Sequence, residues 1–214
     1  MKIIGLISIV FTFFLMSGCG EKMQELQQTA ENLQNVSDAA KQVSQNVDLA
    51  EQKRQERIKK GDTLAIHFEK LQEYLPASIS GYTAKEPEGQ SMNMGEFSFS
   101  TVSREYTKPG KDGMEDYIKI ELVDYNQAGA LYSGMTIWAA GFKFESKEKL
   151  EQTYDPGIQN VVAFESFDKI QKEVKITYGI AWRFILSITA TNQSSSDFAK
   201  QVVSNMKVKE LANM

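Results

Sequence analysis

The sequence VKITYGIAWRFILSIT, residues 174–189, decides the fold of this chain. Apolar side chains occupy every second position in both halves of the stretch: Val174, Ile176 and Tyr178, then Trp182, Phe184, Leu186 and Ile188. Such alternation places one row of side chains in a core and the other row toward solvent, as in a half-buried strand. Gly179 lies between the halves, so the stretch predicts a hairpin. We expect its second strand at the centre of a sheet.

Another hairpin is predicted upstream of this stretch. Apolar and charged residues alternate through residues 118–122, and the turn sequence KPGKDG precedes them at residues 108–113. Before the turn, Phe97 and Phe99 alternate with serine. The alternation then shifts phase at Val102, which predicts a β-bulge between the two parts of the strand.

Shorter apolar runs complete the predicted sheet. Residues 142–144 and 161–167 predict further strands, and residues 77–92 predict a loop because glycine, proline and serine interrupt them. We therefore expect an antiparallel sheet of about five or six strands.

Three helices are expected to pack against this sheet. Residues 63–75 carry leucine and phenylalanine on one helical face, with Asp62 as the expected N-cap. Residues 127–140 form a helix rich in glycine and alanine, and residues 196–206 form the closing helix. Together these patterns predict one α+β domain over residues 61–214.

The first nineteen residues predict where the protein resides. Lys2 is followed by an apolar run at residues 3–15 and by small residues directly before Cys19. A positive start, a short apolar run and a small-residue cleavage site are typical of a secretory signal peptide. The run is too short to cross a bilayer, because a spanning helix needs about 20 residues. We therefore expect residues 1–18 to be a signal peptide that is removed.

The segment Leu15-Met16-Ser17-Gly18-Cys19 resembles the lipobox of bacterial lipoproteins. The resemblance implies that Cys19 carries a diacylglycerol and an acylated amino terminus, with chains such as palmitate holding the protein to a membrane of the cell envelope. Cys19 is the only cysteine, so it has no internal disulfide partner. Gly20 favours the outer membrane in a Gram-negative envelope. The alternative is an ordinary signal peptide followed by an unrelated cysteine.

Residues 19–60 predict a helical, coiled-coil-like stalk between the anchor and the domain. Alanine, glutamate, glutamine and lysine are good helix formers, and no proline occurs in the segment. An apolar seam with the heptad period extends through residues 23–50. This seam fits self-association, an unpaired spacer, or docking on another envelope protein or on the chain's own domain.

Composition and motifs exclude several functions. A formal net charge of −4 argues against nucleic acid as a partner. His67 is the only histidine and has no second ligand at metal-binding spacing, so no metal site is expected. We expect no catalytic residues and no cofactor, because neither a nucleophile–base arrangement nor a phosphate-binding glycine loop is present.

The sequence therefore predicts a membrane-anchored lipoprotein that acts as a non-enzymatic protein-binding or accessory factor. The alternative is a tethered small-ligand receptor. Its pocket would lie between the helix over residues 127–140 and the sheet, with Trp138 and Trp182 as candidate ligand-binding residues. A core role for these aromatic side chains is the competing interpretation.

The order of the expected elements is similar to that of the Mog1/PsbP-like group of small α/β/α sandwiches. The similarity covers residues 62–214, with Leu75-Pro76, Gly81-Tyr82 and the strand from Trp182 to Ile188 as its local landmarks. That group shares no single activity, so the resemblance implies a fold and no site residues.

Overall fold

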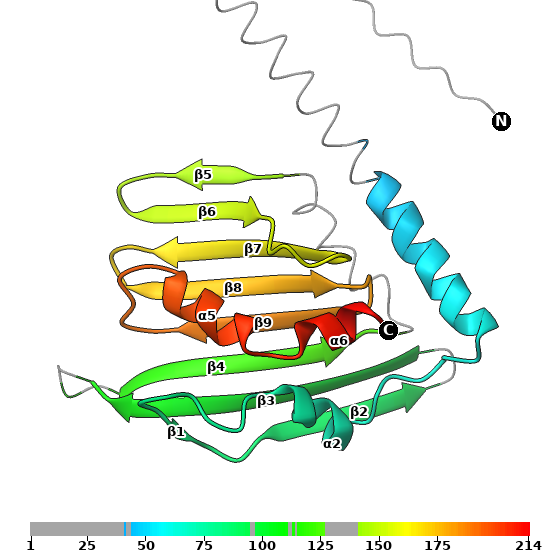
Figure 1. Cartoon of the computed structure of the whole chain (residues 1–214), viewed down its shortest axis with the longest axis horizontal. Coiled ribbons are helices and arrows are strands. Elements are labelled where there is room, and N and C mark those ends of the chain that lie inside the picture. The colour runs from blue at the N-terminus through cyan, green and yellow to red at the C-terminus, as the bar shows by residue number, and fades with distance from the viewer. Residues whose placement is uncertain (1–40, 42–43, 95–96, 111–112, 114, 127–140) are drawn as a thin grey trace, which may run out of the picture. The chain divides into compact units, whose positions relative to one another are not determined.

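The chain forms a nine-stranded antiparallel sheet within the residues that the structure describes (Figure 1). This computed structural model describes residues 41, 44–94, 97–110, 113, 115–126 and 141–214. The strands follow the order β1-β3-β4-β9-β8-β7-β6-β5, and β2 also pairs with β3. Their bounds are β1 (Thr83–Ala84), β2 (Glu88–Met94), β3 (Phe97–Pro109), β4 (Glu115–Asp124), β5 (Lys143–Glu145), β6 (Lys149–Tyr154), β7 (Val161–Asp168), β8 (Glu173–Ile180) and β9 (Phe184–Ala190).

The sheet is larger than the sequence predicts. Five or six strands were expected, and the described residues contain nine. Strands β1 and β2 lie in and just beyond the segment 77–92, which was expected to be a loop. Strand β2 has the sequence EGQSMNM and is mostly exposed, so it carries no apolar alternation that would reveal it. The domain is therefore mostly sheet with a few short helices.

Strand β9 lies at the centre of the sheet, as predicted. It pairs with β4 on one side and with β8 on the other. Every second residue of β9 is fully buried, which confirms the alternation read from the sequence: Phe184, Leu186, Ile188 and Ala190.

The predicted β-bulge in β3 is absent. The register of β3 with β4 runs unbroken from Ser100 opposite Asp124 to Pro109 opposite Glu115. The side chain of Ser100 therefore shares the core-facing row with Val102, and Phe99 lies on the other face. The phase shift in the sequence arises because polar serines occupy buried positions at this end of the strand.

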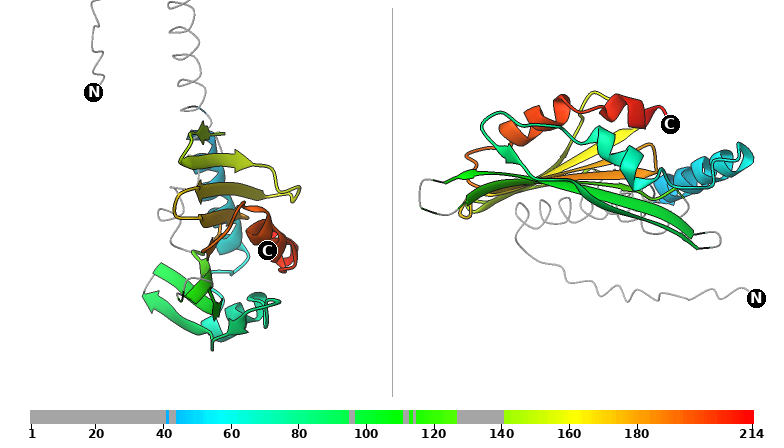
Figure 2. Two further views of the ribbon diagram at one scale, coloured as in Figure 1. Left: turned by 90° about the vertical axis from the view of Figure 1, so that its left-hand side faces the viewer. Right: turned by 90° about the horizontal axis from the view of Figure 1, so that it is seen from below.

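Three short helices cover one face of the sheet (Figure 2). They are α2 (Phe68–Leu71), α5 (Asp197–Ser204) and α6 (Val208–Ala212), and a 3₁₀ turn, η1 (Gln72–Tyr74), continues α2. The expected helix over residues 63–75 is thus reduced to its second half. The closing helix expected over residues 196–206 ends earlier, and α6 follows it. The helix expected over residues 127–140 lies outside the described residues.

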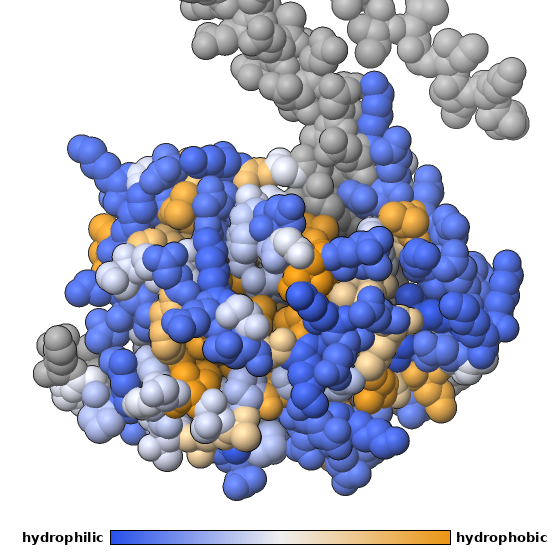
Figure 3. Space-filling model, viewed as in Figure 1, coloured by the Kyte–Doolittle hydropathy of each residue, from blue (hydrophilic) through white to orange (hydrophobic). Residues whose placement is uncertain are grey.

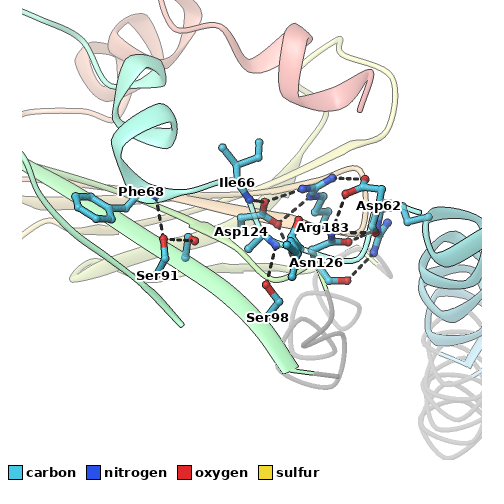
Figure 4. Close-up of polar contacts among 12 residues, drawn as sticks. Asp62, Ile66, Phe68, Ser91, Ser98, Asp124, Asn126 and Arg183 are labelled. Atoms are coloured by element: carbon cyan, nitrogen blue, oxygen red, sulfur yellow. Dashed lines mark hydrogen bonds and ion pairs between the residues drawn. The ribbon is translucent and has the colours of Figure 1, made fainter. Parts of the chain in front are cut away.

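Side chains from the sheet explain why residues 62–67 are not helical. The amide nitrogens of residues 65, 66 and 68 donate hydrogen bonds to Ser98 Oγ, Asp124 Oδ2 and Ser91 Oγ, at 2.7, 2.8 and 2.9 Å (Figure 4). These bonds hold the segment extended against the sheet. Asp62, the expected N-cap, contacts Arg183 and Asn126 instead.

A longer helix precedes this segment and covers residues 44–59, which lie within the predicted stalk. It ends in a Schellman motif, in which the amides of Gly61 and Asp62 donate to the carbonyls of Ile58 and Arg57. Gly61 has a φ of 77°, a conformation that glycine adopts without a steric cost. Residues 19–40 of the predicted stalk lie outside the described residues.

A largely buried polar junction connects this helix to the sheet, and it consists of Arg57, Asp62, Asp124, Asn126 and Arg183. Figure 4 shows the last four of these residues. Arg183 Nε and Nη2 donate to the two carboxylate oxygens of Asp124 at 2.9 and 2.8 Å, and Nη1 donates to Asp62 at 2.7 Å. Asn126 Oδ1 accepts a hydrogen bond from Arg57 Nε at 2.8 Å. Its Nδ2 donates to the Asp62 carboxylate at 3.0 Å. Two guanidinium groups face two carboxylates, so the junction is neutral.

We expect the substitution Arg183→Met to lower the free energy of unfolding by about 3–5 kcal/mol, because it leaves the buried Asp124 carboxylate without its counter-ion. Chemical denaturation monitored by circular dichroism measures this loss. The double substitution Arg183→Met with Asp124→Leu should recover part of the stability, since no unpaired charge remains. The control is Lys119→Met, whose half-buried side chain forms only a surface ion pair with Glu121, and we expect a change below about 1 kcal/mol. Equal stability of Arg183→Met and the control would contradict the role of the junction.

Candidate functional site

A groove of about 540 Å³ opens on the helix-covered face of the sheet. One side is formed by α5, α6 and the turn between them, and the other by the connection from β6 to β7. This face is largely hydrophilic with separate apolar patches (Figure 3). We refer to the hollow as the α5–α6 groove. Its lining residues are Tyr154, Pro156, Gly157, Ile158, Tyr178, Lys200, Val203, Ser204, Met206, Lys207, Val208, Lys209 and Glu210.

Strand register brings two tyrosines together in the groove. Tyr154 on β6 pairs with Ala163 on β7, and Ala163 pairs with Tyr178 on β8. The three residues therefore form one row across the sheet. Because Ala163 is small and fully buried, the two rings can meet over it. Their centroids are 6.2 Å apart in an edge-to-face arrangement, and the hydroxyl oxygens are 2.7 Å apart.

An ion pair between a buried glutamate and a half-buried lysine lies beside the two tyrosines. Glu165 follows Ala163 by two residues on β7, so its side chain points to the same face of the sheet, where it is 1% exposed. Lys200 Nζ from α5 lies 2.8 Å from Glu165 Oε2 and 4.4 Å from the centre of the Tyr154 ring. Gln152 donates a hydrogen bond to the other carboxylate oxygen. The sheet thus holds the lysine ammonium at the floor of the groove.

The protonation states in the groove follow from burial and hydrogen bonding. Burial raises the pKa of Glu165, but hydrogen bonds from Lys200, Ser196 and Gln152 outweigh this effect and leave the pKa below its ordinary value. Burial raises the pKa of Tyr154 and Tyr178 above the ordinary tyrosine value. At neutral pH the carboxylate is therefore ionised and both phenols keep their protons.

The tyrosine pair leaves one hydrogen-bond donor for a ligand. Two phenol groups have two O–H protons, and the bond between Tyr154 and Tyr178 uses only one of them. No further acceptor contacts either hydroxyl within the described residues. Since a buried donor without a partner is unfavourable, an acceptor atom on a ligand or a water molecule would complete the site.

Apolar side chains and lysines form the rest of the groove. Ile158 and Met206 supply partly exposed apolar surface, the core residues Val203 and Val208 lie behind them at 2% exposure, and Lys207 and Lys209 are exposed at the rim. This combination suits a ligand with an apolar body and a polar or negatively charged end.

Trp182, a ligand-binding residue predicted from the sequence, lies in a different place. It lines a hollow of about 250 Å³ between the helix over residues 44–59, the turn from β8 to β9 and the C-terminus. Both Ala181 and Trp182 in this turn have a φ of 52°. The other predicted ligand-binding residue, Trp138, and the predicted lipid-bearing Cys19 lie outside the described residues. A pocket between the two tryptophans remains a prediction.

Sequence reasoning missed the α5–α6 groove. The alternation in residues 174–178 places Tyr178 on the core-facing row, but it does not show that Tyr154 is its neighbour. That contact depends on the pairing of β6, β7 and β8. The lysine that completes the site, Lys200, comes from a helix whose sequence carries only the usual amphipathic signal.

Other kinds of site were sought in the described part of the chain. No group of three histidine, cysteine or acidic side chains there is arranged to hold a metal ion. No helix within the same ranges has the length and apolar character needed to cross a membrane. Comparisons with protein-family models, curated proteins and solved structures found no match to this chain.

We expect the substitution Ala163→Leu to lower the free energy of unfolding by about 1–3 kcal/mol, because the larger side chain would occupy the space where the two tyrosine rings meet. Thermal or chemical denaturation measures the effect. Ala77→Leu at an exposed position is the matched control and should change stability little. A variant Ala163→Leu with the stability of the wild type would show that the rings do not meet over this residue.

Proposed function

We propose that this protein is a lipid-anchored lipoprotein of the bacterial cell envelope, and that its sheet domain is a non-enzymatic receptor for a small ligand in the α5–α6 groove. The groove supports this proposal most directly. It combines apolar walls with a phenol donor and a lysine, which are the features of a binding pocket for an amphiphilic molecule.

The protonation states favour binding over catalysis. A general base must be able to accept a proton near neutral pH. The two phenols are protonated and their pKa values are raised, and Glu165 is engaged by Lys200 and Gln152. The polar groups at the floor of the groove can therefore position a ligand by donating hydrogen bonds, and the other acidic residue of the lining, Glu210, is exposed.

The polar junction supports a role for the segment that follows the anchor. Arg57 near the end of the helix over residues 44–59 is buried and bonded to Asn126. This helix is therefore fastened to the sheet domain and does not act as a free linker at its C-terminal end.

We expect Cys19→Ser to move the protein from the membrane fraction to the soluble fraction of the cell, because no acylated cysteine would remain to hold it. Fractionation with detection of the protein in each fraction measures the change, and intact mass spectrometry detects the lipid on the wild type. Ser17→Ala, which keeps the cysteine and a small residue before it, is the control and should stay with membranes. Membrane association of Cys19→Ser equal to that of the wild type would contradict the anchor.

We expect the neutral apolar dye Nile red to bind the wild-type domain and to bind Ser204→Trp at least about tenfold more weakly. The exposed Ser204 lines the groove, and a tryptophan there would fill it. Dye fluorescence during titration measures the affinity. The control Gln201→Trp lies on the same helix outside the groove and should bind as the wild type does. Equal binding by all three proteins would contradict a ligand site in the groove.

A second candidate function is that of a protein-binding accessory factor. The edge strand β2 pairs only with β3 within the described residues, and it exposes Met92 and Met94. An edge strand with exposed apolar side chains can accept a strand from another protein. Residues 23–50 are the other predicted surface for self-association or for an envelope partner. Crosslinking in cells should then recover a partner whose yield falls with Met94→Lys and is unchanged with Ser204→Trp.

A further inference from the structure

We propose that the ligand of the α5–α6 groove is an apolar chain that ends in a carboxylate. This inference rests on the proposed receptor function and specifies its ligand class. The donors at the floor of the groove, the charge at its rim and the types of residue in its described lining support this ligand class.

The floor of the groove offers two kinds of hydrogen-bond donor, a phenol and an ammonium group. The pair of Tyr154 and Tyr178 has one unused O–H proton. The ammonium of Lys200 has three N–H donors and lies 2.8 Å from Glu165 Oε2. The phenol and ammonium donors belong to neighbouring side chains, because Lys200 lies against the Tyr154 ring. A carboxylate has two acceptor oxygens and can bond to both groups.

The charge of the groove favours an anion. Three lysines, Lys200, Lys207 and Lys209, stand against two glutamates, Glu165 and Glu210, which leaves an excess of one positive charge. Lys207 and Lys209 form no ion pair with another described residue. Glu165 is already bonded to Lys200 and Gln152, so its charge is compensated within the protein.

A carboxylate fits these groups better than a phosphate. Phosphate sites commonly use arginine forks or a series of backbone amides to satisfy three oxygens. No arginine lines the groove among the described residues. One phenol and one ammonium match two oxygens, and the apolar wall formed by Ile158, Val203, Met206 and Val208 can bury the rest of the molecule.

Isothermal titration with three probes of equal chain length tests the charge of the ligand. The probes are decanoate, methyl decanoate and decylamine, each added to the full-length protein with its anchor cysteine replaced by serine. We expect decanoate to bind at least about tenfold more tightly than the ester, because a charge-assisted hydrogen bond contributes about 1.5–3 kcal/mol. The amine, which repels the lysines, should bind most weakly.

Tyrosine substitutions test the phenol donor with a distinctive pattern. Tyr154→Phe and Tyr178→Phe each leave one phenol, whose proton becomes free to bond to the ligand, so each should retain decanoate affinity within about threefold. The double variant has no phenol proton and should bind decanoate about tenfold or more weakly, with little change for the ester. Tyr117→Phe, outside the groove, is the control.

The outcomes separate this inference from the proposed function. Equal affinity for acid and ester, or a double tyrosine variant that binds decanoate as the wild type does, would overturn the carboxylate and leave a neutral-ligand receptor. Preference for decylamine would also overturn it. If Nile red and all three probes fail to bind a folded wild-type protein, both the carboxylate and the receptor function are wrong. Circular dichroism of each variant establishes that it is folded.

Discussion

The pairing of Arg183 with Asp124 is the interaction on which the arrangement of the domain depends. A guanidinium and a carboxylate are costly to remove from water, and the cost is offset only when their donors and acceptors are bonded. Asp124 meets this requirement by accepting hydrogen bonds from Arg183 and from the backbone amides of Ile66 and Asn126. The same network continues from Asn126 to Arg57. The buried ion pair and its hydrogen-bonded neighbours therefore hold the central strands β4 and β9, residues 62–67 and the helix over residues 44–59 in a single arrangement.

Local sequence patterns predict those parts of the fold that are buried on one face. Strand β9 is such a part, and its alternation and central position follow from the sequence. Strand β2 was not predicted, because its outer edge is unpaired within the described residues and most of its side chains are exposed. The helix expected from residue 63 is the opposite case: an apolar helical pattern is present, but the first half of the helix does not form. Its backbone amides bond to Ser91, Ser98 and Asp124, and no local signal records contacts with such distant residues.

The groove likewise depends on contacts between distant residues, which local sequence patterns do not predict. Alternation is sufficient to place Tyr178 on the core-facing row, and chemistry is sufficient to mark aromatic residues as candidates. The encounter with Tyr154 further requires that β6, β7 and β8 pair in one register and that the residue between the rings, Ala163, is small. The sequence alone does not show which strands pair, so it shows neither the register nor which residue lies between the two rings. Trp182 was predicted as one of the aromatic residues that could line a pocket, but it lies in a turn and lines another hollow.

The ion pair of Glu165 and Lys200 gives the strongest reason to regard the groove as more than a gap beside two short helices. A buried ion pair contributes little net stability, and an apolar pair of similar size would often stabilise the same position better. Its physical effect is to fix an ammonium group against the Tyr154 ring, while the lysine side chain stays partly exposed. Glu165 on the sheet compensates the charge of the ammonium group. The ammonium keeps N–H donors that can bond to a ligand in the groove. The carboxylate of the protein thereby positions a cation for the carboxylate of a ligand.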